Sequence, residues 1–408
     1  MNILILHRIP YARIDYHRGI DHSQHQVTYI GEQALIATLP QDLRCTAVVR
    51  PGKADSFAEV QAWLEQHPQH FDRVISLSEY ELLAAARLRD TYAIPGASVS
   101  QVLLTRNKLL MKDAVAASGL RVPRYQALAD FLQNLPALPW SGKTVVKPHS
   151  GASSVGVEIH ASAMQAAQAL KRRIADGTLL ANAFEVEEFI EGSVRHFDGL
   201  IQDGALYEIT ASQYVGSCHG YMEHGQPLGS FQIEVTPNIR QWVEQALAAV
   251  QIRNGSFHLE AIMEGDEPVF LEVGNRVGGA EVVATFEMAT GVHLPSQELR
   301  IHLGTEILSE RAARSQERPF LGWFVYAGHC QQEATFHGLS GAEDFIQHCA
   351  VVQWNALRPG ADLPRHVTYS AHEAPLSGIV KFANADQTQA WLEDLFSQVQ
   401  LREASRLD

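Results

Sequence analysis

The stretch that decides the fold of this 408-residue chain runs from Phe257 to Val273 and reads FHLEAIMEGDEPVFLEV. Two apolar runs flank the turn-forming segment from Glu264 to Pro268, which is the pattern of a β-hairpin. If the strands pair symmetrically about Asp266, Glu260 lies directly opposite Glu272. Like charges in such a pair are destabilising, because their Cβ atoms are only about 4.5–5.5 Å apart. A hard divalent cation that binds carboxylate oxygens would neutralise them.

Polar residues and glycines follow the second strand of this hairpin. Asn275 adds an amide oxygen of the kind that Mg²⁺ accepts, and Arg276 adds a fixed cation. Gly278 and Gly279 let the backbone approach a ligand closely, or form an ordinary turn. His258 shares a strand face with the first glutamate of the pair, so we expect it to border the site or to be a structural histidine. The alternative for the pair is that one glutamate faces solvent.

A second polar region lies upstream, between Lys143 and Val157, where the chain reads strand, loop, strand. Lys147 ends the first strand, and the loop from Ser150 to Gly156 has only small or hydroxyl side chains apart from Val155. Such a loop can direct backbone N–H groups at a phosphate, although it has neither of the two commonest phosphate-loop spacings. Alternatively, it is a flexible hairpin tip and Lys147 is a strand-end lysine with its head in solvent.

Two further segments carry charges whose role the sequence leaves open. Lys108 lies on a helix that we expect from Thr105 to Gly119, where it could be an ordinary surface lysine. From Glu185 to Gly192 four carboxylates alternate with apolar residues. Acidic strands are unfavourable unless a face is exposed or a partner is present. This segment is therefore a solvated edge strand or one that faces a ligand.

Composition narrows the class of protein. Apolar residues make up 46% of the chain, and the formal net charge is −14, which disfavours nucleic acid and anionic membranes as partners. The four cysteines are far apart and form no metal or disulfide pattern, which fits a cytoplasmic protein. No apolar run reaches the roughly 18 residues of a membrane span. Apolar strands alternate with helices from Met1 to about Ser100, which predicts a small parallel α/β layer with helices at Ser56–Gln66 and Ser78–Thr91.

Taken in order along the chain, these segments resemble the ATP-grasp ligases from about Ile94 to Gly291. The resemblance rests on the set as a whole, since no single element is specific. It implies an α/β and α+β multidomain fold. A Rossmann-like domain would cover residues 1–100, and an ATP-grasp domain would cover residues 101–305, with a lid subdomain at about 141–190. A C-terminal α+β domain, residues 306–408, would complete or cap the active site.

The resemblance also implies the cofactors, ATP and Mg²⁺ with Mn²⁺ as a substitute, and a role for each candidate residue. Lys108 and Lys147 would hold the phosphates beneath the loop. Glu187 would accept a hydrogen bond from the adenine amino group, next to the backbone of Glu188 and Ile190. The candidate phosphate contacts of the loop are Ser150, Gly151, Ser153 and Ser154. The candidate metal ligands are Glu260, Glu272 and Asn275. The candidate catalytic residues are Arg276 and Lys147.

Within that superfamily the chain is most similar to carboxylate-amine ligases of the L-amino-acid ligase type. The segment from Arg195 to Gly199 resembles their Tyr-His-Val-Asp-Gly, the strand before Glu260 their G-x-F-H-x-E, and the segment from Asn275 to Gly279 their Asn-Pro-Arg-x-Gly-Gly turn. The chain departs from the pattern in lacking that proline. It also has Val194 in place of a ribose-binding glutamate, for which Glu191 and His196 are the candidate replacements.

The resemblance implies an ADP-forming ligase that joins amino acids, or an amino acid and a related carboxylate, through an acyl phosphate. Its partners would be a small-molecule carboxylate and amine, with no nucleic acid and no membrane, and a homodimer is left open. The candidate substrate residues are His258, Gly278 and Gly279. The segments at 214–221 and 225–231 line the acceptor pocket or form an exposed crossover. Two alternatives stay open: a biotin-carboxylase-like or purine-pathway enzyme that activates bicarbonate or formate, and a non-catalytic nucleotide-binding module.

Overall fold

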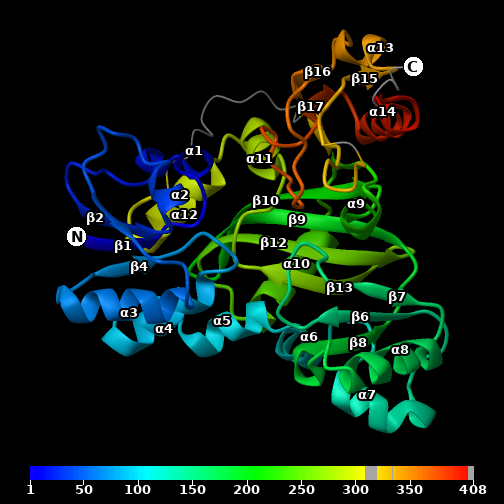
Figure 1. Cartoon of the computed structure of the whole chain (residues 1–408), viewed down its shortest axis with the longest axis horizontal. Coiled ribbons are helices and arrows are strands. Elements are labelled where there is room, and N and C mark those ends of the chain that lie inside the picture. Colours follow the sequence, from blue (N-terminus) through cyan, green and yellow to red (C-terminus); the bar gives the residue numbers. More distant parts are fainter. Residues whose placement is uncertain (308–318, 333, 403–408) are drawn as a thin grey trace.

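The computed structural model describes residues 1–307, 319–332 and 334–402, so parts of the predicted C-terminal domain (308–318, 333 and 403–408) lie outside it. The N-terminal part is a four-stranded parallel sheet of order β3-β2-β1-β4. Helices α3 (Ser56–Gln66) and α4 (Leu82–Tyr92) pack on one face, and α12 (Leu294–Leu303) packs on the other (Figure 1). The strands are Asn2–Leu6 (β1), Gln26–Gly31 (β2), Thr46–Val49 (β3) and Arg73–Ile75 (β4).

The predicted helix from Ser78 begins four residues later, at Leu82. The backbone N–H of Ser78 bonds to the Ser76 hydroxyl, and the N–H of Glu81 bonds to the Ser78 carbonyl. A short hydroxyl side chain that bonds to nearby backbone favours a turn over a helix. Residues 77–81 therefore form a loop at the carboxyl end of β4, and this loop carries Glu79 toward the middle of the molecule.

Two consecutive helices connect the N-terminal part to the rest, and the predicted helix start at Thr105 is wrong. Helix α5 (Val99–Arg106) contains Thr105, whose hydroxyl bonds to the carbonyl of Val102. The next helix, α6 (Lys108–Ala117), is capped by the side chain of Asn107, which accepts from two backbone N–H groups. Lys108 is therefore the first residue of α6.

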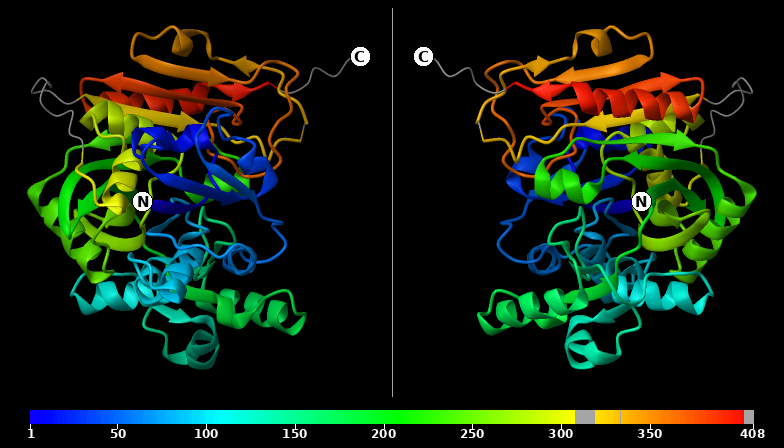
Figure 2. Two further views of the ribbon diagram at one scale, coloured as in Figure 1. Left: turned by 90° about the vertical axis from the view of Figure 1, so that its left-hand side faces the viewer. Right: turned by 90° about the vertical axis from the view of Figure 1, so that its right-hand side faces the viewer.

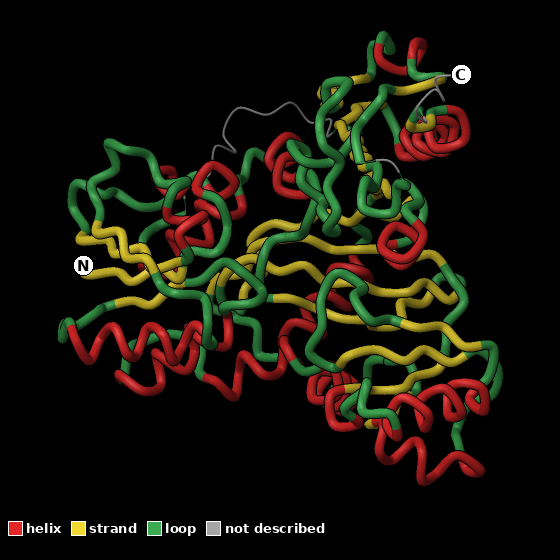
Figure 3. Tube along the Cα trace, in the orientation of Figure 1, coloured by secondary structure: helices red, strands yellow, loops and turns green. Residues whose placement is uncertain are grey.

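A second four-stranded sheet, which we call the lid sheet after the predicted lid subdomain, has the strand order β5-β8-β6-β7. Its strands are Tyr125–Ala127 (β5), Thr144–Pro148 (β6), Glu158–His160 (β7) and Phe184–Glu188 (β8). Helices α7 (Leu128–Asn134) and α8 (Ala163–Ala175) cover its outer face and bury an apolar cluster with the strands (Figure 3). The predicted order strand, loop, strand is present, although the second strand begins only at Glu158. The acidic strand β8 lies between β5 and β6 and is not an edge strand.

An antiparallel sheet of eight strands, order β13-β12-β9-β10-β11-β14-β17-β16, forms the centre (Figure 2). Helices α6 and α10 (Pro237–Ala249) cover part of one face, where Phe257 and Leu259 are fully buried. The sheet includes C-terminal strands, so residues after 319 extend it. The strands are Ser193–Gln202 (β9), Ala205–Val215 (β10), Leu228–Ile233 (β11), Gly255–Glu264 (β12), Glu267–Gly274 (β13), Phe320–Val325 (β14), Val351–Ala356 (β16) and Leu376–Phe382 (β17).

Other helices complete the described part. Helix α11 (Val282–Thr290) packs on β14, and α14 (Ala385–Gln398) packs on the C-terminal strands. None of the helices in the described ranges is long and apolar enough to cross a membrane.

Candidate active site

The hairpin β12–β13 pairs Glu260 with Glu272, as the sequence predicts. The turn is shorter than expected: Glu264 pairs with Glu267, which leaves only Gly265 and Asp266 between the strands. A β-bulge between Glu260 and the next pair compensates for this, because it inserts one extra residue, Leu271, into β13. Because of the bulge, Leu271 and Glu272 both line the same cavity.

Two cavities meet at these glutamates. The lid cavity, of about 330 Å³, lies between the lid sheet and the hairpin. The interdomain cavity, of about 530 Å³, is lined by the loop after β4, by the segment from Arg276 to Glu281, and by Trp323 and Tyr369. Six residues line both cavities: Ala152, Ser154, Tyr214, Cys218, Glu260 and Glu272. A molecule in one cavity can therefore contact a molecule in the other at the paired carboxylates.

The lid cavity is apolar at one end and charged at the other. Its apolar lining comes from both the lid and the hairpin and includes Val145, Ile159, Phe189, Ile190 and Leu271. Its charged lining consists of Lys108, Lys147, Glu187, Glu188, Glu260 and Glu272. This combination suits a ligand that has a flat apolar ring and an anionic tail.

Lys108 connects the hairpin to the Gly/Ser loop. Its ammonium group lies 2.8 Å from Oε2 of Glu272 and donates to the carbonyl of Gly151 at 2.9 Å. Arg106 donates to the carbonyl of Ser150 at 3.0 Å. Ser153 and Ser154 both have positive φ values, 56° and 57°, a conformation that is costly for residues other than glycine. The two cations thus hold the predicted phosphate loop over the point where the cavities meet.

Lys147 belongs to a buried ionic quartet that the sequence did not reveal in full. The quartet consists of Lys112, Lys147, Glu185 and Glu187, with side chains no more than 6% exposed. Lys147 lies 2.6 Å from Glu187, and Lys112 pairs with both glutamates. Although burial lowers the pKa of Lys147, the two carboxylates raise it further than burial lowers it. The signal that was missed is the spacing of Lys108 and Lys112, one helical turn apart.

The predicted adenine contacts fall into two groups. Glu187, Glu188 and Ile190 line the lid cavity, but the carboxylate of Glu187 already pairs with the two lysines of the quartet. Glu188 accepts from the backbone N–H of Arg124. Glu191, by contrast, is 84% exposed beside Lys143 and does not line the cavity. It is therefore not placed to bind a ribose there.

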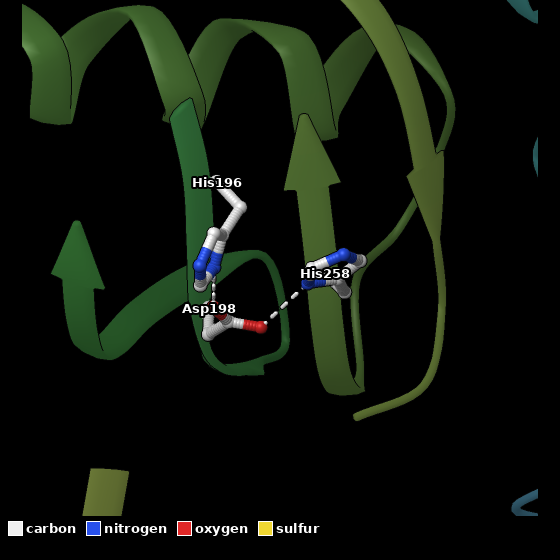
Figure 4. A group of neighbouring side chains, drawn as sticks. All are labelled: His196, Asp198 and His258. Atoms are coloured by element: carbon white, nitrogen blue, oxygen red, sulfur yellow. Dashed lines mark hydrogen bonds and ion pairs between the residues drawn. The ribbon is translucent and has the colours of Figure 1, made fainter. Parts of the chain in front are cut away.

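His196 also lies outside the lid cavity, in a hydrogen-bonded cluster with Asp198 and His258 (Figure 4). Nδ1 of His196 and Nδ1 of His258 lie 2.5 and 2.7 Å from the two oxygens of Asp198. Nε2 of His196 bonds to the Ser230 hydroxyl at 2.7 Å. These three residues could hold a metal ion by geometry alone, but hydrogen bonds already satisfy them. The prediction that His196 replaces a ribose-binding glutamate is wrong, because its imidazole is buried in this cluster.

The cluster supports the first glutamate of the pair. Nε2 of His258 lies 3.4 Å from Oε1 of Glu260, which also accepts from the Tyr214 hydroxyl at 2.8 Å. Burial alone would lower the pKa of His258, but Asp198 and Glu260 raise it to about 9. His258 is therefore cationic at neutral pH and orients Glu260. The parity of His196 and Asp198 on one strand was the available sequence signal for this cluster.

The second glutamate is partly exposed to the cavities and ionised. Burial favours the neutral acid, but the ammonium groups of Lys108 and Lys147 lower the pKa of Glu272 below its ordinary value. The Glu272 side chain is 31% exposed, and that of Glu260 is 13% exposed. Two carboxylates that face each other at the junction of two cavities offer the hard oxygen donors that Mg²⁺ prefers. The residues present therefore fit this ion.

Asn275 does not join the two glutamates. Its amide nitrogen donates to the backbone carbonyls of Asn254 and Ser256, and it lines a third cavity, behind the sheet. The reason is strand alternation: Asn275 is an odd number of residues from Glu272 and points to the other face. The prediction that Asn275 binds the same metal as the glutamates is not supported by this geometry.

Arg276 and the glycines after it line the interdomain cavity. Nε of Arg276 lies 2.9 Å from Oε2 of Glu79, and a second nitrogen donates to the carbonyl of Val277. An ideal Cβ on Gly278 would lie 2.7 Å from Asp198, so no side chain fits there, whereas Gly279 faces open space. Of the predicted acceptor segments, Tyr214 and Cys218 line both cavities, and Leu228 lines the interdomain cavity alone.

Comparisons with known proteins bear on the fold of the chain. No protein-family model matches the chain. An L-amino acid ligase from Bacillus licheniformis has a TM-score of 0.71 at 20% identity, covering 99% of this chain and 98% of its own. A biotin carboxylase from Campylobacter jejuni has a TM-score of 0.64 at 13% identity, covering 98% and 92%. The chain therefore has the ATP-grasp fold, and the predicted resemblance is confirmed.

The chain is also similar in sequence to known proteins. The chain is 26% identical over 242 residues to the L-arginine-specific L-amino acid ligase of Bacillus subtilis. The aligned region covers 57% of each protein. The match therefore spans under three fifths of that relative's length. An uncharacterized protein of Sinorhizobium fredii is 22% identical over 308 residues, 61% of its length. The resemblance to L-amino acid ligases predicted from the sequence is thus seen in both sequence and fold.

Proposed function

We propose that the protein is an ATP-dependent, ADP-forming carboxylate-amine ligase that joins amino acids. The observation that carries this proposal is the junction of the lid cavity and the interdomain cavity at Glu260 and Glu272. ATP would lie in the lid cavity with its adenine at the apolar end. Amino acids would lie in the interdomain cavity. The N-terminal sheet, in the place of the predicted Rossmann-like domain, would supply one wall of that cavity.

Each charged group at the junction has a role in this proposal. Lys108 and Lys147 attract the phosphates, and the loop from Ser150 to Ser154 covers them. Glu260 and Glu272 bind Mg²⁺, for which Mn²⁺ can substitute. When bound, this ion would supply positive charge beside the transferring phosphoryl group, and the protein's own residues would contribute mainly positioning and charge stabilisation. Arg276, which lines the interdomain cavity, would bind the transferring phosphoryl group and steady the oxyanion that forms when the amine attacks the acyl carbon.

The proposed reaction has two steps. The substrate carboxylate attacks the γ-phosphorus of ATP, ADP leaves, and an acyl phosphate forms. The amine of the second substrate then attacks the acyl carbon, phosphate leaves with the electrons of the broken carbon–oxygen bond, and the nitrogen releases a proton to solvent. Because acyl phosphates hydrolyse in water, the loop that covers the junction protects the intermediate.

The interdomain cavity favours amino acids over the smaller acids of the alternative function. Relatives of similar fold include N5-carboxyaminoimidazole ribonucleotide synthetases and a biotin carboxylase, with TM-scores of 0.64 to 0.66. A cavity of about 530 Å³ is within the usual range for ligands much larger than bicarbonate or formate. Its lining of six carboxylates and three arginines also suits zwitterions.

The test is ADP and phosphate formation from ATP and Mg²⁺ across a panel of amino acids, singly and in pairs, with bicarbonate and formate as comparison acids. Mass spectrometry of the products identifies any new amide. We expect pairs of amino acids to stimulate phosphate release and to yield a dipeptide. Stimulation by bicarbonate or formate alone would favour the alternative function. If no acid stimulates release above background, the ligase proposal fails.

A further inference from the structure

Strand β13 ends with a glycine on the face that carries Glu272. Aligning the chain with Asn-Pro-Arg-x-Gly-Gly through Arg276 and the two glycines places the asparagine of that segment at Gly274. Gly274 is two residues from Glu272, so an added side chain would point to the same face. The asparagine oxygen expected beside the two glutamates is thus lacking in this chain, and Asn275 does not replace it, since its side chain points to the other face.

A carboxylate from the N-terminal part lies next to Gly274. An ideal Cβ on Gly274 would lie 2.9 Å from Oε2 of Glu79, closer than real Cβ contacts come. The Glu79 oxygen therefore occupies the space into which an asparagine at position 274 would project. Glu79 lines the interdomain cavity together with Glu260 and Glu272. The loop that carries it begins where β4 ends, about 180 residues before the hairpin begins.

Two arginines fix Glu79 and balance its charge. Arg106 pairs with Oε1 of Glu79, and Arg276 donates to Oε2 at 2.9 Å. The Glu79 side chain is only 11% exposed. An asparagine is neutral, so a glutamate in its place adds one negative charge, which is costly when buried unless a cation is near. Arg106 supplies that cation, and its neighbour along the chain, Asn107, caps the helix that carries Lys108.

We propose that Glu79 is a third acidic ligand of the metal site, and that it supplies from the N-terminal part the oxygen that Gly274 cannot. An ionised carboxylate has about four lone-pair sites, so Glu79 can accept from Arg106 and Arg276 and still bind a cation. The inference rests on the proposed function, because the ion in question is the one that accompanies ATP. It makes the N-terminal part a component of the active site.

The test is calorimetric titration of Mn²⁺ into the full chain in the presence of a non-hydrolysable ATP analogue. Glu79→Ala should weaken Mn²⁺ binding by at least about tenfold, since loss of an outer-shell partner alone costs about 10- to 100-fold. Gly274→Asn should also weaken it, because the new side chain would collide with Glu79. The double variant Glu79→Ala/Gly274→Asn should bind Mn²⁺ more tightly than either single variant, since the amide oxygen then takes the place of the carboxylate.

Glu264→Gln is the matched control, because Glu264 forms an exposed ion pair with Arg121 at the far end of the same hairpin. It should leave Mn²⁺ affinity unchanged, and thermal melts report whether each variant folds. If folded Glu79→Ala binds Mn²⁺ as the wild type does while its turnover falls, Glu79 only positions Arg276 and the inference is wrong. The same holds if the double variant shows no recovery. Failure of the proposed function would instead show as a wild type that binds Mn²⁺ and nucleotide but joins no amino acids.

Discussion

The quartet in the lid and the hairpin pair each contain two glutamates, yet the two groups differ in exposure and in charge balance. In the quartet two lysines face two glutamates, and no side chain is more than 6% exposed. At the hairpin Glu260 and Glu272 face each other, and Glu272 is 31% exposed at the junction of two cavities. Lys112 and Glu185 are paired and line neither cavity, so they serve the fold, whereas like charges that face a cavity are available to a ligand.

The largest expected effect comes from breaking the quartet. Lys112→Met leaves two buried carboxylates with one lysine, so the free energy of unfolding should fall by about 3–5 kcal/mol. Urea denaturation measures this loss. The control is Lys143→Met, because Lys143 is exposed beside the exposed Glu191 and should change stability by about 1 kcal/mol at most. Equal effects of the two changes would show that the quartet is not a buried ionic unit.

The next largest effect concerns the hairpin itself. Glu272→Gln should lower the rate of ADP formation by on the order of 100-fold, because it removes a proposed metal ligand. The loss of an outer-shell partner alone lowers metal affinity or activity by about 10- to 100-fold. The melting temperature should fall little, since Glu272 is partly exposed. Glu267→Gln, an exposed position on the same strand, is the control. Undiminished turnover in Glu272→Gln would contradict the proposed role.

Alkaline pH should weaken the contribution of His258 to stability and leave that of the quartet unchanged. Its folded pKa is about 9, above the ordinary value of 6.5, so the stability it contributes is fully present below about pH 6.5. That contribution is lost as pH rises through about 9, by at most about 1.4 kcal/mol per pH unit. Lys147 in the quartet keeps its charge over this range, because its pKa is raised. Denaturation curves at several pH values, with His258→Gln for comparison, test this; an equal loss in both proteins would refute it.

The smallest expected effect comes from the hydroxyl that supports Glu260. Tyr214→Phe removes one hydrogen bond to a carboxylate that keeps His258 as a partner. We expect kcat/KM for ATP to fall by about fivefold, which corresponds to about 1 kcal/mol, the usual net value of a hydrogen bond. Tyr369→Phe, at another residue that lines the interdomain cavity, tests whether the loss of any phenol there has the same effect. If both variants lose activity equally, the contact of Tyr214 with Glu260 has no special role.

The pairing of Glu260 with Glu272 could be predicted from the sequence because both strands are apolar and the turn residues between them are evident. The agreement also reflects two compensating departures. The turn is shorter than predicted, which shifts the register next to it. The bulge at Leu271 then restores the predicted register on the side away from the turn, where Glu260 pairs with Glu272. A bulge depends on packing against neighbouring strands, so the hairpin sequence alone does not reveal it.

Contacts between distant segments account for the residues that the sequence did not reveal. Glu79 meets Arg276 across 197 residues, and Lys112 meets Glu187 across 75. Each of these residues reads as a surface charge within its own segment. Asn275 shows the reverse error, because a polar residue near a site attracts a role that strand alternation denies it. Only the folded chain shows which charges share a cavity.

One measurement tests the central claim that Glu260 and Glu272 jointly bind the metal ion used with ATP. The full chain is mixed with Mn²⁺ and a non-hydrolysable ATP analogue, and electron–nuclear double resonance detects phosphorus nuclei next to the bound ion. We predict phosphorus couplings in the wild type and none in folded Glu260→Gln/Glu272→Gln under the same conditions. A double variant that gives the wild-type couplings at the same Mn²⁺ stoichiometry would contradict the claim.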